Sequence, residues 1–140
     1  MSDLFLLAFL GHLVGDFMLQ PKYTALHKGD STLEGFRLCT VHVLVYSAAV
    51  CTFLGSANLV VFGLVFAPHW IIDKWSLATW WTRMIRGRTF KDAFESVDKY
   101  KSFDIAFTSI IYTVIDMTMH LLCLFALTIF MLKFSVSSWL

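Results

Sequence analysis

Four apolar segments dominate the sequence and set the strongest limit on its fold. They cover residues 4–20, 36–54, 59–81 and 105–132. Each approaches or exceeds the roughly 20 predominantly apolar residues that a helix needs to cross the hydrocarbon core of a membrane. The sequence therefore predicts an all-α fold in which one transmembrane domain, residues 1–140, forms a four-transmembrane-helix bundle.

The composition rules out a water-soluble monomer. Hydrophobic residues make up 58% of the 140 residues and charged residues only 15%, whereas a soluble domain is roughly half apolar and about a quarter charged. A chain of this size cannot bury so many apolar side chains, because a small domain keeps a large share of its surface exposed. The formal net charge of +1 gives no overall basic surface for nucleic acid, so we expect membrane lipid rather than nucleic acid as the partner.

The distribution of basic residues predicts the orientation of the four spans. Nine of the 11 Lys and Arg residues lie within or beside the connections 21–35 and 82–104, which fall on the same side of a four-span protein. Loops that are rich in Lys and Arg stay in the cytoplasm. We therefore predict a multi-pass protein of the bacterial inner membrane, with both termini and a tight turn at residues 55–58 on the non-cytoplasmic side.

The second cytoplasmic connection contains a further helical pattern. Phe90, Phe94 and Val97 recur at helical spacing with charged residues between them. This pattern predicts a short amphipathic helix on the membrane surface, between the third and fourth spans. A solvated charged linker is the alternative interpretation of so short a stretch.

Seven ionisable side chains interrupt the predicted spans. An Asp at the centre of a membrane costs about 2.5–3.5 kcal/mol on insertion scales. These side chains must therefore be paired with one another or bind a ligand. They are four histidines and three aspartates: His12, Asp16, His42, His69, Asp73, Asp116 and His120.

The spacing of these residues points to a metal site. Three spans each carry a His and an Asp four residues apart, and residues i and i+4 share one face of a helix. Their imidazoles and carboxylates suit one or two divalent ions, with Zn as the first choice and Mn, Fe, Ni or Mg as alternatives. Seven ligands exceed the need of one tetrahedral ion, which leaves open a dinuclear site or one ion with outer partners. Polar contacts between helices and a proton or ion relay are the competing interpretations.

Depth along each helix indicates a single cluster in the cytoplasmic half of the membrane. At about 1.5 Å of rise per residue, Asp16 lies roughly 6 Å from the cytoplasmic end of its span. It is the shallowest of the three aspartates, so we assign it the role of catalytic base. Three weaker candidates for orienting a ligand or a substrate lie nearby in the sequence: Gln20, Tyr46 and Lys74.

The motifs that contain these residues resemble a known family. The first of them is the most specific, and in chain order they read His12-x3-Asp16-Phe17-x2-Gln20, Val41-His42-x3-Tyr46, His69-x2-Ile72-Asp73-Lys74 and Asp116-x3-His120. Together they resemble the small integral-membrane family of phages and bacteria that is catalogued as domain of unknown function 3307. The resemblance implies a polytopic inner-membrane protein, encoded by a bacterium or a phage, and it implies no particular activity.

Three functions compete for such a cluster. The leading hypothesis is a membrane-embedded metal-dependent hydrolase that acts from the cytoplasmic side on a lipid, a lipid-linked phosphate or a similar ester, because a bound ion activates water. The second is a divalent-cation or proton transporter, although the outer halves of the spans are almost wholly apolar, which favours a closed pocket over a path. The third is a phage membrane interaction protein with a structural metal. A homo-oligomer is compatible with all three.

Overall fold

The structure is a computed structural model that describes residues 2–133, and over this range it is all-α, without a strand. The predicted fold class is therefore confirmed at this level. The predicted domain of residues 1–140 extends past the described part by residue 1 and residues 134–140. The helices are α1 (Ser2–Leu13), η1 (Val14–Met18), α2 (Lys22–His27), α3 (Leu33–Leu54), α4 (Leu59–Lys74), α5 (Leu77–Arg86), α6 (Phe90–Glu95) and α7 (Lys101–Lys133).

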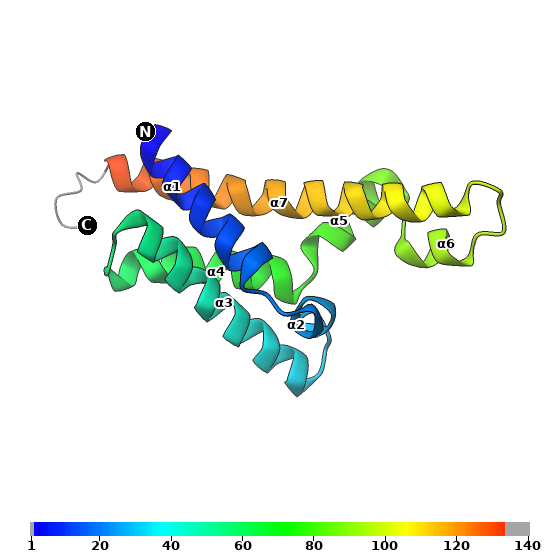
Figure 1. Cartoon of the computed structure of the whole chain (residues 1–140), viewed down its shortest axis with the longest axis horizontal. Coiled ribbons are helices and arrows are strands. Elements are labelled where there is room, and N and C mark those ends of the chain that lie inside the picture. Colours follow the sequence, from blue (N-terminus) through cyan, green and yellow to red (C-terminus); the bar gives the residue numbers. More distant parts are fainter. Residues whose placement is uncertain (1, 134–140) are drawn as a thin grey trace.

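The helices form two parts that share α7 (Figure 1). In the first part, α1, α3 and α4 pack with the C-terminal half of α7 as a bundle, with α2 at one end. In the second part, α5 and α6 pack along the N-terminal half of α7. The start of α1, the turn between α3 and α4 and the end of α7 all lie at the bundle end opposite α2.

Local side-chain and backbone signals define the hairpin of α3 and α4. Thr32 caps α3, because its Oγ1 accepts a hydrogen bond from the Gly35 N–H at 3.0 Å. Gly55 ends the helix with φ of 65°, a left-handed conformation that glycine adopts without a steric cost. Asn58 then caps α4, as its Oδ1 accepts from the Val60 N–H at 2.8 Å. The predicted turn at residues 55–58 is confirmed.

Helices α1 and α3 approach one another closely along two glycines. A Cβ atom added at Gly11 would lie 2.7 Å from the Val50 Cα, and one added at Gly15 would lie 2.9 Å from Tyr46 Cδ2. Small residues four apart on one face are the usual means by which two apolar helices pack backbone to backbone. This close approach brings the end of α1 against the histidine-bearing part of α3.

The predicted third segment, residues 59–81, is divided in the structure. Helix α4 ends at Lys74, and Ser76 follows with φ of 47°, which breaks the helical path before α5 begins. Trp80 and Trp81 therefore belong to α5, a separate amphipathic helix, and not to the end of a span. The break falls at Asp73-Lys74-Trp75-Ser76, and the predicted segment was extended across these residues to Trp81.

The predicted amphipathic helix after residue 89 is also shorter than its pattern suggested. Helix α6 ends at Glu95, and Val97 lies beyond it with a fully exposed side chain. The segment is held to α7 by Arg88, whose Nη1 lies 2.7 Å from Asp104 Oδ1 and 3.3 Å from Thr108 Oγ1. The predicted role of Val97 in an apolar face was therefore wrong.

Two of the helices, α3 and α7, are long and apolar enough to cross a membrane by themselves. They have 22 and 33 residues, whereas α1 has 12 and α4 has 16. The five-residue π-helix η1 continues α1 by a further wide turn. By length and composition, α1 and α4 therefore do not qualify as candidate membrane spans.

Candidate metal centre

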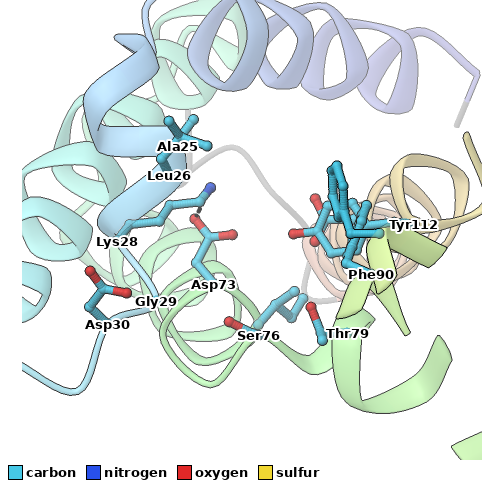
Figure 2. Close-up of a pocket in the computed structure, with 13 residues that line it drawn as sticks. Ala25, Leu26, Lys28, Gly29, Asp30, Asp73, Ser76, Thr79, Phe90 and Tyr112 are labelled. Atoms are coloured by element: carbon cyan, nitrogen blue, oxygen red, sulfur yellow. Dashed lines mark hydrogen bonds and ion pairs between the residues drawn. The ribbon is translucent and has the colours of Figure 1, made fainter. Parts of the chain in front are cut away.

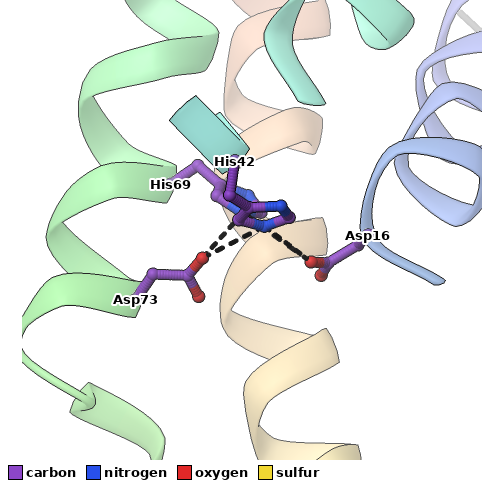
Figure 3. A group of neighbouring side chains, drawn as sticks. All are labelled: Asp16, His42, His69 and Asp73. Atoms are coloured by element: carbon purple, nitrogen blue, oxygen red, sulfur yellow. Dashed lines mark hydrogen bonds and ion pairs between the residues drawn. The ribbon is translucent and has the colours of Figure 1, made fainter. Parts of the chain in front are cut away.

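Four of the seven predicted residues converge between three elements of the bundle (Figure 3). Asp16 comes from η1, His42 from α3, and His69 and Asp73 from successive turns of α4. Their ligand atoms all lie within 4.8 Å of one another. All four side chains are buried. We call these four residues the primary cluster.

The distances within the primary cluster match those between ligands of one metal ion. The His69 Nε2 lies 3.1 Å from Asp73 Oδ2 and 3.2 Å from His42 Nε2, which in turn lies 3.3 Å from the same Asp73 oxygen. With metal–ligand bonds of about 2.0–2.1 Å, the edges of a ligand tetrahedron measure about 3.3–3.4 Å. The three atoms therefore form a triangle that fits one face of such a tetrahedron.

Asp16 lies beside this triangle, on the side of His42. Its Oδ1 is 3.2 Å from His42 Nε2 and 3.8 Å from His69 Nε2. The wide helical turn of η1 carries it there, and such π-helical turns are frequent at functional sites. Asp16 can thus complete the coordination shell or act on a molecule bound at the fourth position.

Two more predicted residues, both from α7, lie next to the primary cluster. Asp116 and His120 form a second possible metal-binding group with Asp16, again with all ligand atoms within 4.8 Å. The ring of His120 lies against that of His69 with centroids 4.1 Å apart. Its Nε2 is 3.7 Å from Asp73 Oδ1.

His12 joins neither of these groups. Its Nδ1 lies 3.2 Å from the Tyr46 hydroxyl and 4.0 Å from Asp16 Oδ2. The Tyr46 ring in turn stacks on His69 with centroids 3.6 Å apart. His12 and Tyr46 therefore form a buried layer behind the cluster, which orients Asp16 and His69.

Several buried polar atoms in this region have no hydrogen-bond partner within the described part of the chain. They include Asp16 Oδ1, His12 Nε2 and His120 Nε2. Buried polar side-chain atoms are satisfied in most proteins, and exceptions call for an explanation. A bound cation would supply the missing partner for an oxygen or an imidazole lone pair, so the donor set fits a metal.

Lys28 also belongs to the site, although nothing in the sequence pointed to it. It follows directly after α2, and its Nζ lies 2.7 Å from Asp73 Oδ2 and 3.9 Å from Asp16 Oδ1. Burial alone would lower the pKa of this ammonium, but the negative charges of Asp73 and Asp16 raise it above the ordinary value. Lys28 therefore carries a positive charge beside the two carboxylates.

The loop after α2 is fixed against the end of α4, which explains how Lys28 reaches the site. Lys74 Nζ donates to the carbonyl oxygen of Asp30 at 2.6 Å. A Cβ atom at Gly29 would lie 2.6 Å from Ser76 Oγ, so the loop packs closely against the end of α4 at this glycine. Lys74, which we predicted to orient a ligand or a substrate, thus contacts the backbone of this loop. Gln20, a second such candidate, has a buried amide nitrogen without a hydrogen-bond partner in the described part of the chain.

A pocket of about 540 Å³ opens next to the cluster (Figure 2). It lies between the α2 loop and α4 on one side and α5, α6 and α7 on the other. Lys28, Asp73 and Asp116 give it a charged inner wall, whereas Leu26, Ile72, Phe90, Phe94 and Tyr112 give it an apolar one. Of the predicted residues, Asp73 and Asp116 thus border a space in which a molecule with both a charged and an apolar part can bind.

A family model described as a protein of unknown function (DUF3307) matches residues 4–140. No curated protein and no solved structure matches the chain.

Proposed function

We propose that the chain, which belongs to the DUF3307 family, is a membrane-embedded metal-dependent hydrolase. In this proposal its substrate is a lipid, a lipid-linked phosphate or a similar ester, taken up from the cytoplasmic side. The observation that carries the proposal is the triangle of His42, His69 and Asp73, with edges of 3.1–3.3 Å, in which Asp73 also lines a pocket of about 540 Å³. Three protein ligands with an open fourth position are the pattern of catalytic zinc, whereas structural zinc has four.

The exposed surface of the bundle supports its place in lipid. Large apolar side chains are exposed on every long helix, while the histidine and aspartate side chains that are buried are those of His12, Asp16, His42, His69, Asp73 and His120. Soluble monomers rarely expose such contiguous apolar surface. The exposed set on the bundle includes Leu6, Leu10, Val41, Leu44, Val45, Val60, Leu64, Leu122, Phe125 and Leu132. We infer four spans, made by α1 with η1, α3, α4 and the C-terminal half of α7.

The length of α7 supports a site close to the cytoplasmic interface. From Asp116 to Lys133 the helix rises about 26 Å, close to the roughly 30 Å of the hydrocarbon core. The residues before Asp116 then project into the cytoplasm together with α5 and α6, where six basic side chains gather. A reporter fused after residue 140 tests this orientation, because activity of a reporter that works only in the cytoplasm would reverse it.

The chemistry follows from the ligands and from Asp16. A divalent ion on His42, His69 and Asp73 would lower the pKa of a bound water toward neutrality and would polarise a phosphoryl or acyl oxygen. Asp16 Oδ1 lies on the open side of the triangle without a hydrogen-bond partner and is therefore our choice for the acceptor of the water proton. Lys28 would bind the negative charge of the substrate from the pocket wall.

Transport across the membrane is less well supported. Beyond Tyr46 the bundle interior is filled by a core of Ala8, Val50, Leu54, Val61, Val65, Leu124, Leu127 and Met131, with little or no exposure. A cation crossing this region would lose its hydration without finding a carboxylate or an imidazole in that core. A polar site that borders an apolar core agrees better with hydrolysis than with the passage of a cation across the membrane.

The test is a hydrolysis screen on lipid, lipid-linked phosphate and nucleotide esters, with several divalent metals. We expect turnover by the wild-type protein, and at least a 100-fold loss in Asp73→Asn and Asp16→Asn variants that are inserted and melt normally. The exposed Asp92 on α6 supplies the control, because Asp92→Asn makes the same chemical change away from the pocket. Absence of turnover by the wild type, together with metal flux in proteoliposomes that Asp73→Asn abolishes, would replace hydrolysis by transport.

A further inference from the structure

We infer that a second divalent cation binds beside the first, held by Asp116, His120 and one oxygen of Asp16. The inference rests on the proposed function, because it extends the same centre from one ion to two. Ligand atoms of these three residues lie within 4.8 Å of one another. Asp16 belongs to both groups, so one of its oxygens can bind the second ion while the other stays free to accept the water proton.

The hydrogen bonding of His120 prepares it for a metal. Its Nδ1 lies 2.9 Å from the carbonyl oxygen of Asp116, which requires that Nδ1 carry the proton and donate it. The lone pair then resides on Nε2, which is buried and has no hydrogen-bond partner within the described residues. A ligating histidine is usually fixed by such a bond from its other nitrogen to a carbonyl or carboxylate.

The carboxylate of Asp73 also has an oxygen on each side. Oδ2 contacts His42 and His69 within the primary cluster, whereas Oδ1 lies 3.7 Å from His120 Nε2. A carboxylate that offers its two oxygens to two neighbouring positions is the arrangement required to link a pair of ions, and in such pairs the ions lie about 3.5–4 Å apart.

The net charge of the site indicates which substrate a second ion would favour. When Asp16, Asp73 and Asp116 are all ionised they carry three negative charges, which Lys28 and one divalent ion would balance. A second divalent ion leaves two positive charges in a site where they are poorly screened. A phosphate dianion would balance them, so the two-ion centre selects phosphate esters over neutral carboxylic esters.

A substitution at Asp116 distinguishes the two proposed metal sites by experiment. It lines the pocket, its side chain is 21% exposed, and it lies outside the primary cluster. Asp116→Asn should therefore remove the second ion and leave the first in place. His120→Gln should do the same, which provides a second variant if one of the two fails to fold.

The experiment measures bound Zn²⁺ or Mn²⁺ per chain by plasma mass spectrometry, after titration of the detergent-purified protein and removal of free metal. Inorganic phosphate binding to each metal-loaded protein is then measured by calorimetry. We expect two ions in the wild type and in the Asp92→Asn control, one ion in Asp116→Asn and His120→Gln, and loss of phosphate binding in both variants.

One ion in the wild type, unchanged by Asp116→Asn, would overturn the second site and leave the proposed hydrolase standing. No bound ion in the wild type would overturn both. Two ions that persist in Asp116→Asn and in His120→Gln would place the second ion elsewhere and would also overturn this inference.

Discussion

The two ends of the bundle interior are built from the same four helices but with opposite chemistry. Near α2, the inward positions hold Asp16, His42, His69, Asp73 and His120. At the other end they hold aliphatic side chains such as Val50, Val61, Leu124 and Leu127. An apolar interior can pack without unpaired polar atoms, whereas the polar end leaves several of them. The contrast supports our proposal that the polar end binds a ligand, whereas the apolar end stabilises the bundle.

The first prediction removes the chemistry of the polar end. Asp73→Asn keeps the shape of the side chain but removes the charge that faces His42, His69 and Lys28. We expect metal affinity to fall by more than about 100-fold, because even the loss of an outer partner costs about 10–100-fold. Metal content of the purified variant measures this. A variant that retains the wild-type metal content would show that the Asp73 carboxylate is not a ligand of the ion.

The second prediction addresses the apolar end. Leu127→Ala removes a buried side chain from the core and should lower the free energy of unfolding by about 2–5 kcal/mol. The metal content should not change, because Leu127 lies away from the cluster. Thermal unfolding in detergent and metal analysis of the same sample separate the two effects. Loss of metal in this variant would contradict the division of the bundle into two independent ends.

The third prediction tests the close contact between α1 and α3, which run through both ends of the bundle. Gly11→Ala would place a methyl group 2.7 Å from the Val50 Cα and should destabilise the protein by about 1–3 kcal/mol. Gly63 in α4 provides the control, because a Cβ there meets nothing within 4 Å. Gly63→Ala should be neutral or slightly stabilising, since alanine favours a helix. Equal melting temperatures of the two variants would argue against close packing of α1 on α3.

The smallest expected effect concerns Lys28. Lys28→Met should leave the metal content intact, because an ammonium is not a ligand, and should raise KM for a phosphate ester about tenfold, as a charge-assisted hydrogen bond is lost. Steady-state kinetics of wild type and variant measure the change. A loss of bound metal in Lys28→Met would instead assign this lysine to the assembly of the cluster.

Much of the fold and of the cluster could be predicted from periodicity. The apolar runs located α3 and α7 closely, and the spacing of four residues placed His69 and Asp73 on one face of α4, where they contact at 3.1 Å. Both signals are local, because hydropathy and helical spacing depend on neighbouring residues alone. For the same reason six of the seven predicted residues lie in two adjoining groups, while their binding of a metal stays a prediction.

The remainder depends on contacts between distant parts of the chain. The approach of Lys28 to Asp73 joins residues 45 apart and follows from the packing of a glycine against Ser76. The break between α4 and α5 rests on the backbone of Ser76, where φ is 47°. The position of His12 behind the cluster follows from its contact with Tyr46, which spacing along α1 does not encode.

X-ray absorption at the zinc edge of the purified wild-type protein tests the central claim most directly, since it reports both the metal and its ligands. We predict stoichiometric metal bound by imidazole nitrogen and carboxylate oxygen at about 2.0–2.2 Å, with the imidazole contribution reduced in a His42→Ala variant. Protein without stoichiometric metal after preparation free of chelators, or metal in an environment without imidazole, would contradict the account.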